Sequence, residues 1–483
     1  MSATDLTAIL PLIIVGITAV AAMLMTAFRR NHELTLAITA SGLALSILSL
    51  AVPAELGPRP ITGMLIVDHF TVFYFALVLA SALGVAMLSY GYLKKCSGPH
   101  EELYILLLLA VFGAMVLIAS DNLVSLFLGL EILSVSLYAL ISYHRDSVVG
   151  AEAGVKYLIL GAVSSAFLVF GMALIYFETG TLQFSRVASA SVGGTVSSTV
   201  ILGGLALIIV AVGFKLSLVP FHMWVADVFE GSPAPVTAFV ATVSKGSIFA
   251  LILRYFAVLD IHAYRSLLVV FALVAVASMF VGNYLALMQR NVKRMLAYSS
   301  VAHMGYLLVA FLASGPMAPV AVTFYLVAYF ITSLGAFGTI SVLSEGEREA
   351  SSIESLRGLA WRRPWLGAGL TVMMLSLAGI PLTAGFLGKF YVLAAGVESG
   401  LWALVSLLVI NSAIGLFYYL RVVSMIYSPA SHLTRPAGIE EIGWPSSMAE
   451  TATLLLLTAL VIWFGVNPSP LIHIIQSAVA GLL

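Results

Sequence analysis

The stretch from Gly213 to Val236 reads GFKLSLVPFHMWVADVFEGSPAPV. It continues an apolar run that starts near Thr199, so Lys215 falls where a membrane helix would be surrounded by hydrocarbon. Five residues later, Pro220 lacks the N–H that a helix needs and clashes with the preceding turn, so the helix must break or kink. A broken helix in a membrane is tolerated only where protein or a wet cavity satisfies the freed backbone. A lysine beside such a break is typical of an ion or proton path, although Lys215 could instead extend its side chain to a nearby surface.

The composition indicates an all-α polytopic membrane protein. The chain has 483 residues, of which 61% are hydrophobic and only 9% are charged. No class of soluble globular protein has such a composition, and the apolar helices of a membrane protein pack side by side in one bundle. The net charge is zero, which argues against a nucleic-acid partner.

The sequence predicts no cofactor or metal site in this chain. Cys96 is the single cysteine, which excludes a disulfide and any iron–sulfur or zinc site built on several cysteines. The sequence has no glycine-rich phosphate loop and no dinucleotide-binding fingerprint between a strand and a helix. The chain is therefore not expected to bind or oxidise a nucleotide by itself. Its first apolar run lacks a basic start and is too long for a signal peptide, so we expect it to be a retained span.

Polar residues divide the apolar runs into predicted membrane spans. Two of these spans are unsuited to a simple helix: the seventh contains Pro220, and the twelfth contains Pro381 with three glycines in the stretch LSLAGIPLTAGFLGKFYVL. The fourteen predicted spans are 6–27, 34–53, 69–92, 103–119, 123–142, 155–177, 199–222, 234–257, 266–288, 295–313, 318–343, 365–396, 401–427 and 448–466.

The arginines and lysines between the spans predict the orientation. Connections after odd-numbered spans carry fifteen of them, and the opposite connections carry four. Because such residues concentrate in cytoplasmic loops, both termini are predicted to be non-cytoplasmic. The fifteen are Arg29, Arg30, Lys94, Lys95, Arg145, Lys156, Arg290, Lys293, Arg294, Arg348, Arg357, Arg362, Arg363, Arg421 and Arg435; the four are Arg59, Arg186, Arg254 and Arg265.

The positions of the two irregular spans suggest an internal repeat. If spans 4–8 and 9–13 form two blocks of five, the broken helix is the fourth of each block, and the second block enters the membrane from the opposite side. Matched interrupted helices in inverted halves mark transport sites, although proline and glycine are common in membrane helices and the match could be coincidental. The predicted divisions are three N-terminal helices at 1–102, repeats at 103–258 and 266–428, and a C-terminal helix and tail at 447–483. The polar stretch 344–364 is expected to form a short cytoplasmic surface helix, and the tail after Asn467 to lie along the outer surface.

Four ionisable residues fall inside the predicted spans. Helical rise places Glu131 about 12 Å into its span, Lys245 about 16 Å, and Lys215 about 24 Å if its helix stays regular. Lys389 follows the break at Pro381 and belongs to the outer half. Each such charge costs about 2.5–3.5 kcal/mol to insert, which favours a function. Burial lowers the pKa of a lysine and a nearby carboxylate raises it again, so a lysine can load and release a proton where an arginine cannot.

Structural explanations remain open for each candidate. Glu131 could form a fixed ion pair with a lysine of a neighbouring span, and Lys245 and Lys389 could serve packing alone. His222, just after Pro220, could relay protons or satisfy the broken backbone, and His303 could relay protons or be a hydrogen-bonded histidine of the bundle. Lesser candidates are Lys156, explained by interfacial anchoring, and Asp227 and Glu230, which could form a funnel or be ordinary loop charges.

The sequence resembles a known family at these residues over essentially its whole length. The motifs FKLSLVPFHMW with DVFEGSPAPV, LFLGLEILSV, VKRMLAYSSVAHMGYLL and MLSLAGIPLTAGFLGKFYVL are similar to those of the antiporter-like membrane subunits of proton-pumping NADH:quinone oxidoreductase, respiratory complex I. The resemblance implies fourteen helices with inverted five-helix repeats. It places the family's essential glutamate at Glu131 and its channel lysines at Lys215, Lys245 and Lys389. Ala226 departs from the pattern, because the family usually has proline before the aspartate.

The resemblance implies a proton-translocating subunit of a bacterial inner-membrane complex, without redox chemistry of its own. NADH, FMN, iron–sulfur clusters and quinone would be bound by partner subunits, and other membrane subunits, including antiporter-like ones, would be the neighbours. The alternative is a subunit of a multisubunit cation/proton antiporter, which shares the fold. A purely structural membrane-arm spacer would need none of the buried lysines.

Overall fold

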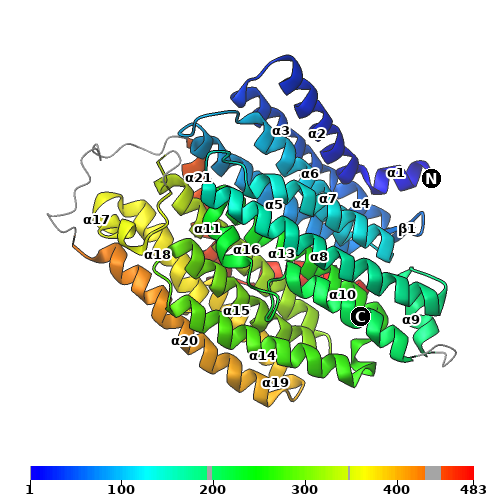
Figure 1. The fold of residues 1–483 in the computed structure, drawn as a ribbon. Helices are drawn as coiled ribbons and strands as arrows, with labels where there is room; N and C mark the ends of the chain where they lie inside the picture. Colours follow the sequence, from blue (N-terminus) through cyan, green and yellow to red (C-terminus); the bar gives the residue numbers. More distant parts are fainter. Residues whose placement is uncertain (1, 193–197, 346–348, 430–447, 483) are drawn as a thin grey trace.

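The computed structural model describes residues 2–192, 198–345, 349–429 and 448–482. Nearly all of its regular structure is helical, as the composition predicts. The helices pack lengthwise in one bundle, with the N-terminal helices at one edge and α14, α19 and α20 at the other (Figure 1). The N-terminal part comprises α1 (Ala3–Ala8), α2 (Leu10–Phe28), α3 (His32–Ser49), α4 (Ala51–Leu56), β1 (Arg59–Ile61), β2 (Leu65–Val67) and α5 (His69–Leu93).

The central part of the chain covers the residues for which two five-helix blocks are predicted. The first block comprises α6 (Glu101–Ile118), α7 (Leu123–Ile141), α8 (Val148–Thr179), α9 (Phe184–Val192), α10 (Ser198–Lys215), α11 (Val225–Gly231), α12 (Ala234–Phe239), η1 (Val240–Ser244) and α13 (Lys245–Leu259). After the turn η2 (Ile261–Ala263), the second comprises α14 (Arg265–Leu287), α15 (Val292–Leu312), α16 (Met317–Leu343), η3 (Ile353–Leu356), α17 (Leu359–Arg362), α18 (Pro364–Ala378), α19 (Ala384–Glu398) and α20 (Trp402–Tyr427). The chain ends with α21 (Met448–Val466), α22 (Ser469–Val479) and η4 (Ala480–Leu482).

Twelve spans in the described residues are long and apolar enough to cross a membrane, which confirms a polytopic helical membrane protein. They correspond to twelve of the fourteen predicted spans, with α3 and α4 forming one of them and α12 to α13 another. The other two predictions are the seventh and the twelfth spans, which are both interrupted. The count of fourteen, the inverted repeats and the proposed divisions of the chain stay predictions.

The first interruption follows Lys215, the last residue of α10. The chain then turns back on itself: the N–H of Leu218 donates to the Gly213 carbonyl at 2.8 Å, and the N–H of Val219 donates to Ser278 Oγ of α14 at 3.0 Å. The indole of Trp224 donates to the Phe214 carbonyl at 2.9 Å. Side chains and backbone of the protein therefore satisfy polar groups that the break releases, as a break within a membrane requires.

The second interruption separates α18 from α19. Gly379 adopts φ +83°, a left-handed conformation that suits glycine, and its N–H donates to the Leu375 and Ser376 carbonyls at 3.0 Å. At the start of α19, the N–H of Gly385 donates to Ser376 Oγ at 3.1 Å. A β-carbon at position 379 would lie 2.9 Å from Cδ of Lys389, so the backbone of this break packs directly on that lysine.

A third irregularity was not predicted from the sequence. Residues Val240–Ser244 form the π-helix η1, which lies between α12 and α13 and ends immediately before Lys245. A π-turn contains one residue more than an α-turn and commonly occurs at functional sites. The sequence VATVS contains neither proline nor glycine, so nothing in its pattern marked the change of helix type.

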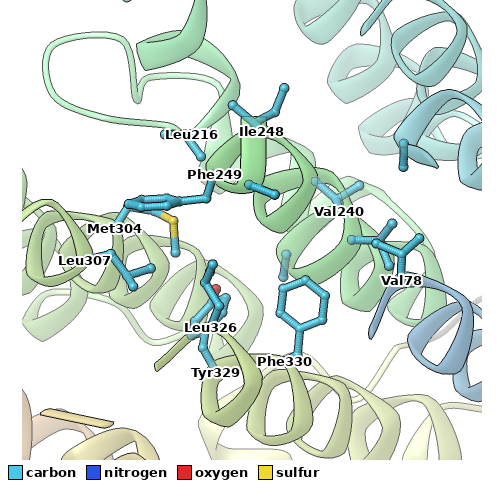
Figure 2. Close-up of a cluster of buried hydrophobic side chains, with 14 of the residues drawn as sticks. Val78, Leu216, Val240, Ile248, Phe249, Met304, Leu307, Leu326, Tyr329 and Phe330 are labelled. Atoms are coloured by element: carbon cyan, nitrogen blue, oxygen red, sulfur yellow. The ribbon is translucent and has the colours of Figure 1, made fainter. Parts of the chain in front are cut away.

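The helices around η1 form the centre of the bundle. An 18-residue stretch of the span from α12 to α13 and one of α16 are completely buried, and 94% of such a stretch of α15 is buried. Apolar side chains of these helices, including Val240, Phe249, Met304, Leu326 and Phe330, pack together there (Figure 2). A charged group in this region has no lipid-facing surface to reach and depends on partners within the protein.

Several surface segments differ from the predictions. The N-terminal region contains the antiparallel strands β1 and β2, although the sequence predicted helices alone. Instead of one surface helix over 344–364, the described residues form the short turns η3 and α17; Arg348 and Arg435 lie outside the described residues. The tail forms α22, which buries Leu471 and Ile475 in packing against α5 and α16 and exposes its other side, so its location along the outer surface stays a prediction.

Arg254 also differs from the prediction, which counts it among the charges of the loops. It lies within α13, is 3% exposed and donates two hydrogen bonds of 2.9 Å to the carboxylate of Asp68, the residue that caps α5. Burial disfavours the carboxylate, but the charge and hydrogen bonds of Arg254 outweigh this effect and lower the pKa of Asp68. This two-bond ion pair connects the C-terminal end of α13 to the N-terminal end of α5.

Candidate functional site

The first predicted lysine lies at the break of α10. Lys215 is 2% exposed, and its Nζ donates a 2.6 Å hydrogen bond to Ser134 Oγ of α7. The ammonium lies 5.1 Å from the ring centre of Tyr157 and 6.0 Å from that of Tyr138. The ring centre of Phe214 lies 5.6 Å away, so one hydroxyl and three aromatic rings replace water around Lys215.

Glu131 lies on α7, one turn before Ser134. Its carboxylate accepts a hydrogen bond from Ser165 of α8, and the residue is half-buried. No ion pair of 4.0 Å or less joins Glu131 to Lys215 in the described part of the chain. The direct counter-ion contact considered for these two residues is thus not formed, and Ser134 occupies the position beside the lysine.

Lys245 lies at the centre of the bundle and is 1% exposed. Its Nζ donates to Ser217 Oγ, in the break that follows Lys215, and to Ser300 Oγ of α15 at 2.7 Å. The ring centre of Phe229 lies 5.6 Å from the ammonium. Ser217 is two residues from Lys215, so the break of α10 brings the first two lysines to neighbouring positions.

His303 continues the series on α15, three residues after Ser300. Its Nδ1 lies 2.6 Å from the hydroxyl of Tyr325, and its Nε2 lies 2.9 Å from the hydroxyl of Tyr419. Tyr419 also hydrogen-bonds to Ser299. Both ring nitrogens of this buried histidine thus face groups that can donate or accept a proton.

Lys389, on α19, lies at the second break. Its Nζ donates hydrogen bonds of 2.9 Å to the carbonyls of Leu377 and Ala378 and to Ser412 Oγ. The two carbonyls are the last of α18, where the negative end of the helix dipole favours a cation. The break therefore provides a ready-made position for an ammonium group.

A small cavity of about 10 Å³ lies between His303 and this second break. Its walls include Tyr325, Ser376, Leu377 and Gly385. Its volume is about that required for one water molecule, and polar atoms are available to bind it. Because the Leu377 carbonyl also accepts from Lys389, a water here would lie between the histidine and the environment of the last lysine.

The structure thus arranges Lys215, Lys245, His303 and Lys389 as one buried series. A serine hydroxyl accepts a hydrogen bond from each of the three lysines. The sequence pattern did not predict these serines, because serine is common in membrane helices and gives no distinctive signal. His222 is buried after Pro220, but no hydrogen bond joins it to the three lysines or to Glu131 among the described residues. Within those residues, no three His, Cys, Asp or Glu side chains lie where they could hold a metal ion.

Asp227 and Glu230 belong to an ion-pair network at the end of α11. Asp227 pairs with Lys156 at 2.7 Å and with Arg294 at 2.8 Å, and Arg294 also pairs with Glu230 at 2.7 Å. Burial disfavours the charge of Asp227, but the hydrogen bonds from Lys156 and Arg294 outweigh it and lower the pKa of this carboxyl. These contacts connect α11 to α8 and α15.

Comparison with known proteins gives a consistent result. Residues 120–415 match the family model described as NADH:quinone oxidoreductase/Mrp antiporter, TM. The chain is 46% identical to NADH-quinone oxidoreductase subunit N of Ectopseudomonas mendocina (strain ymp), over 99% of this chain and 97% of that protein.

Solved structures share the fold. A chain of respiratory complex I from Thermus thermophilus with bound aureothin matches 97% of this chain and 99% of its own length, with a TM-score of 0.82 and 31% identity. A chain of the Mrp complex from Dietzia sp. DQ12-45-1b matches 100% of this chain and 98% of its own length, with a TM-score of 0.87 and 21% identity. The latter likeness concerns the fold alone.

Proposed function

This chain belongs to the NADH:quinone oxidoreductase/Mrp antiporter family, and we propose that it acts as the proton-translocating subunit N of an NADH:quinone oxidoreductase. One observation carries the proposal: Lys215, Lys245 and Lys389 are buried in one series, and each ammonium is held by hydroxyl or carbonyl oxygens. Among the described residues, no carboxylate pairs directly with any of the three ammonium groups, and buried cations of this kind are costly to a membrane protein, which favours a transport role.

The chemistry of these residues suits proton transfer. A buried lysine that is held by neutral oxygens can lose its proton without leaving a carboxylate unpaired. A change of charge at one lysine then alters the free energy of protonating the next, because Coulomb interactions are strong in a low-dielectric interior. We propose that electron transfer in partner subunits acts on Glu131 and Lys215, and that the proton passes through Lys245 and His303 to Lys389.

The redox reaction belongs to the partner subunits. Partner subunits of the complex bind NADH, FMN, iron–sulfur clusters and quinone, and this chain holds none of them itself. Its neighbours are other membrane subunits of the same complex. Glu131 is only half-buried within this chain, so its carboxylate can respond to such a neighbour. We assign His222 no step, because it is not joined to the series of lysines.

The alternative is a subunit of a multisubunit cation/proton antiporter. The similarity to the Mrp complex supports that class only at the level of the fold. The 46% identity to subunit N over nearly the whole of both chains favours the oxidoreductase.

Purification of the tagged chain from native membranes distinguishes the two classes. We expect the tagged protein to co-purify with flavin, with iron–sulfur clusters and with NADH:quinone reductase activity, because its partners carry that chemistry. A tagged unrelated membrane protein of the same cell serves as the control. Recovery of a stable complex that holds other antiporter-like chains, but neither flavin nor NADH oxidation, would instead assign the chain to the antiporter class.

We further propose that the protein lies in the bacterial inner membrane with both termini on the non-cytoplasmic side. The distribution of arginine and lysine supports this orientation, and Arg254, which lies in α13, leaves three on the sparse side. A cysteine introduced after Leu483 should therefore react with a membrane-impermeant maleimide in spheroplasts and be protected in inside-out vesicles. Cys96 of the native chain serves as the comparison. Because it is assigned to the cytoplasmic side, it should be protected in spheroplasts and react in inside-out vesicles. Labelling of the C-terminal cysteine only in inside-out vesicles would reverse the assignment.

A further inference from the structure

A cavity of about 420 Å³ lies at the end of the bundle that carries most of the basic loop residues. The connections between α5 and α6 and between α7 and α8 form its walls, and exposed residues such as Gly98 and Asp146 leave it open to the surface. Its polar walls include His100, Glu102 and His144. A cavity of this size and polarity can hold several waters.

A continuous series of hydrogen bonds leads from this cavity into the bundle. His144 Nε2 lies 3.0 Å from the hydroxyl of Tyr92, which donates a 2.9 Å hydrogen bond to Glu349 Oε1. The other carboxylate oxygen of Glu349 pairs with Nζ of Lys293, at the start of α15. Because the tyrosine hydrogen is directed at Glu349, the tyrosine oxygen accepts from His144. Two contacts therefore donate inward to the Glu349 carboxylate, which also accepts from Lys293 on its inner side.

The series leads from the rim of the cavity to the buried start of α15. His144 and Glu349 are half-buried, whereas Tyr92 is 1% exposed and Lys293 is 0% exposed. Lys293 and Ser300 are seven residues apart, so they lie on the same face of α15 at a separation of about 10.5 Å along the helix. Ser300 accepts a hydrogen bond from Lys245. Lys293, the last residue of the series, is therefore about two turns of α15 away from Ser300, the serine that holds the central lysine.

We propose that His144, Tyr92, Glu349 and Lys293 form the cytoplasmic proton intake of this chain. The proposal rests on the proposed function. A proton taken up by His144 from cavity water passes to the Tyr92 oxygen while Tyr92 gives its own proton to the Glu349 carboxylate. Neutral Glu349 no longer balances the charge of Lys293, so Lys293 releases a proton toward Lys245 and then takes the proton that Glu349 holds. One proton enters and one leaves. The Tyr92 hydroxyl then rotates back toward Glu349 and His144 returns to its first tautomer through exchange with cavity water, which restores the starting state.

A fixed structural ion pair would account for part of this arrangement. Lys293 also donates to the carbonyls of Glu230 and Ser232, and the Glu349 carboxylate accepts from the N–H of Ala234 at the start of α12. These contacts hold α11, α12 and α15 together. A structural pair, however, requires neither the tyrosine hydroxyl nor a histidine that connects it to an open cavity.

Tyr92→Phe separates the two explanations, because it removes only the hydroxyl and leaves the ring packing and the Lys293–Glu349 pair. Proton pumping and NADH oxidation are measured in inside-out vesicles that contain the whole assembled complex. We expect Tyr92→Phe to lower proton uptake per complex by about tenfold, in line with the loss of a positioned proton donor. Tyr104→Phe is the matched control: Tyr104 is equally buried, and its hydroxyl also contacts a histidine, His32, at 2.8 Å, outside the intake. We expect it to pump as the unmodified complex does.

Glu349→Gln and Glu349→Asp provide a second measurement that does not depend on Tyr92. Glutamine keeps two hydrogen-bonding atoms but does not take up and release a proton, whereas aspartate does. We therefore expect pumping to be lost with glutamine and to recover in part with aspartate. Normal pumping in both Tyr92→Phe and Glu349→Gln would overturn the intake, as would an equal loss in Tyr104→Phe. Lys245→Met is measured in parallel: if it blocks pumping while the intake variants do not, the proposed function stands and the intake alone fails.

Discussion

Replacement of Lys245 with methionine is expected to lower NADH-driven proton uptake by about a hundredfold while the complex still assembles. Methionine has a similar length but carries no proton, so the series would be interrupted between the break of α10 and His303. Removing a buried ammonium also removes its burial cost, so the variant should not be less stable than the native chain. Inside-out vesicles with a pH-sensitive dye measure the uptake, and blue native electrophoresis measures assembly.

Lys245→Arg completes this prediction. Arginine keeps the positive charge but holds its proton too tightly to release it, so we expect pumping to be as low as in the methionine variant. The pair of variants distinguishes three roles. A relay requires that both fail, a fixed structural cation requires that arginine works and methionine does not, and a spacer requires that methionine pumps normally. Either of the last two results would contradict the relay.

Replacement of Glu131 with glutamine is the second large effect, and we expect proton uptake to fall by about tenfold or more. The change removes the charge at nearly constant shape, and glutamine can still accept the hydrogen bond from Ser165. Lys215 keeps its hydrogen bond to Ser134, so the fold around the first lysine should persist. What is lost is a carboxylate whose charge favours the protonated form of Lys215.

Glu152→Gln is the matched control for Glu131→Gln. Glu152 lies on α8, its side chain is 59% exposed, and it pairs with Lys156 outside the series of buried lysines. We expect this control to pump normally, because an exposed ion pair contributes little and lies away from the proton path. Equal pumping by the two variants, in membranes with equal amounts of assembled complex, would reduce Glu131 to a packing role.

The sequence predicted the parts of this structure that depend on residues close together in the chain. Long apolar runs specify membrane helices because hydrocarbon leaves the backbone no other partner. Pro220 specifies the first break because proline removes a helical hydrogen bond, and the stretch around Pro381 specifies the second. Lysines within apolar runs are conspicuous because their insertion is costly, so the position of Lys245 in its run is sufficient to make it a candidate.

The connections within the site could not be predicted in the same way. Ser217 and Ser300 hold Lys245, but they come from segments that the sequence places far apart, and a serine is inexpensive almost anywhere in a helix. Arg254 was misplaced for a related reason: its partner Asp68 is 186 residues away in the chain, and only the packing of α13 against α5 brings them together. Contacts of this kind depend on how helices are arranged, which a single sequence does not contain.

The π-helix η1 determines the azimuth of the central lysine about its own helix axis. The π-turn at Val240–Ser244 contains one residue more than an α-turn. Because each residue of an α-helix turns the chain by about 100°, an uninterrupted α-helix of the same sequence would place Lys245 about 100° further around the axis. That rotation would turn the ammonium away from Ser217 and Ser300, although the amino acid at position 245 would be unchanged. The position of this charge is therefore encoded in a backbone insertion upstream of it. A change of hydrogen-bonding register in one helical turn is enough to form or break the contacts of the Lys245 ammonium with Ser217 and Ser300.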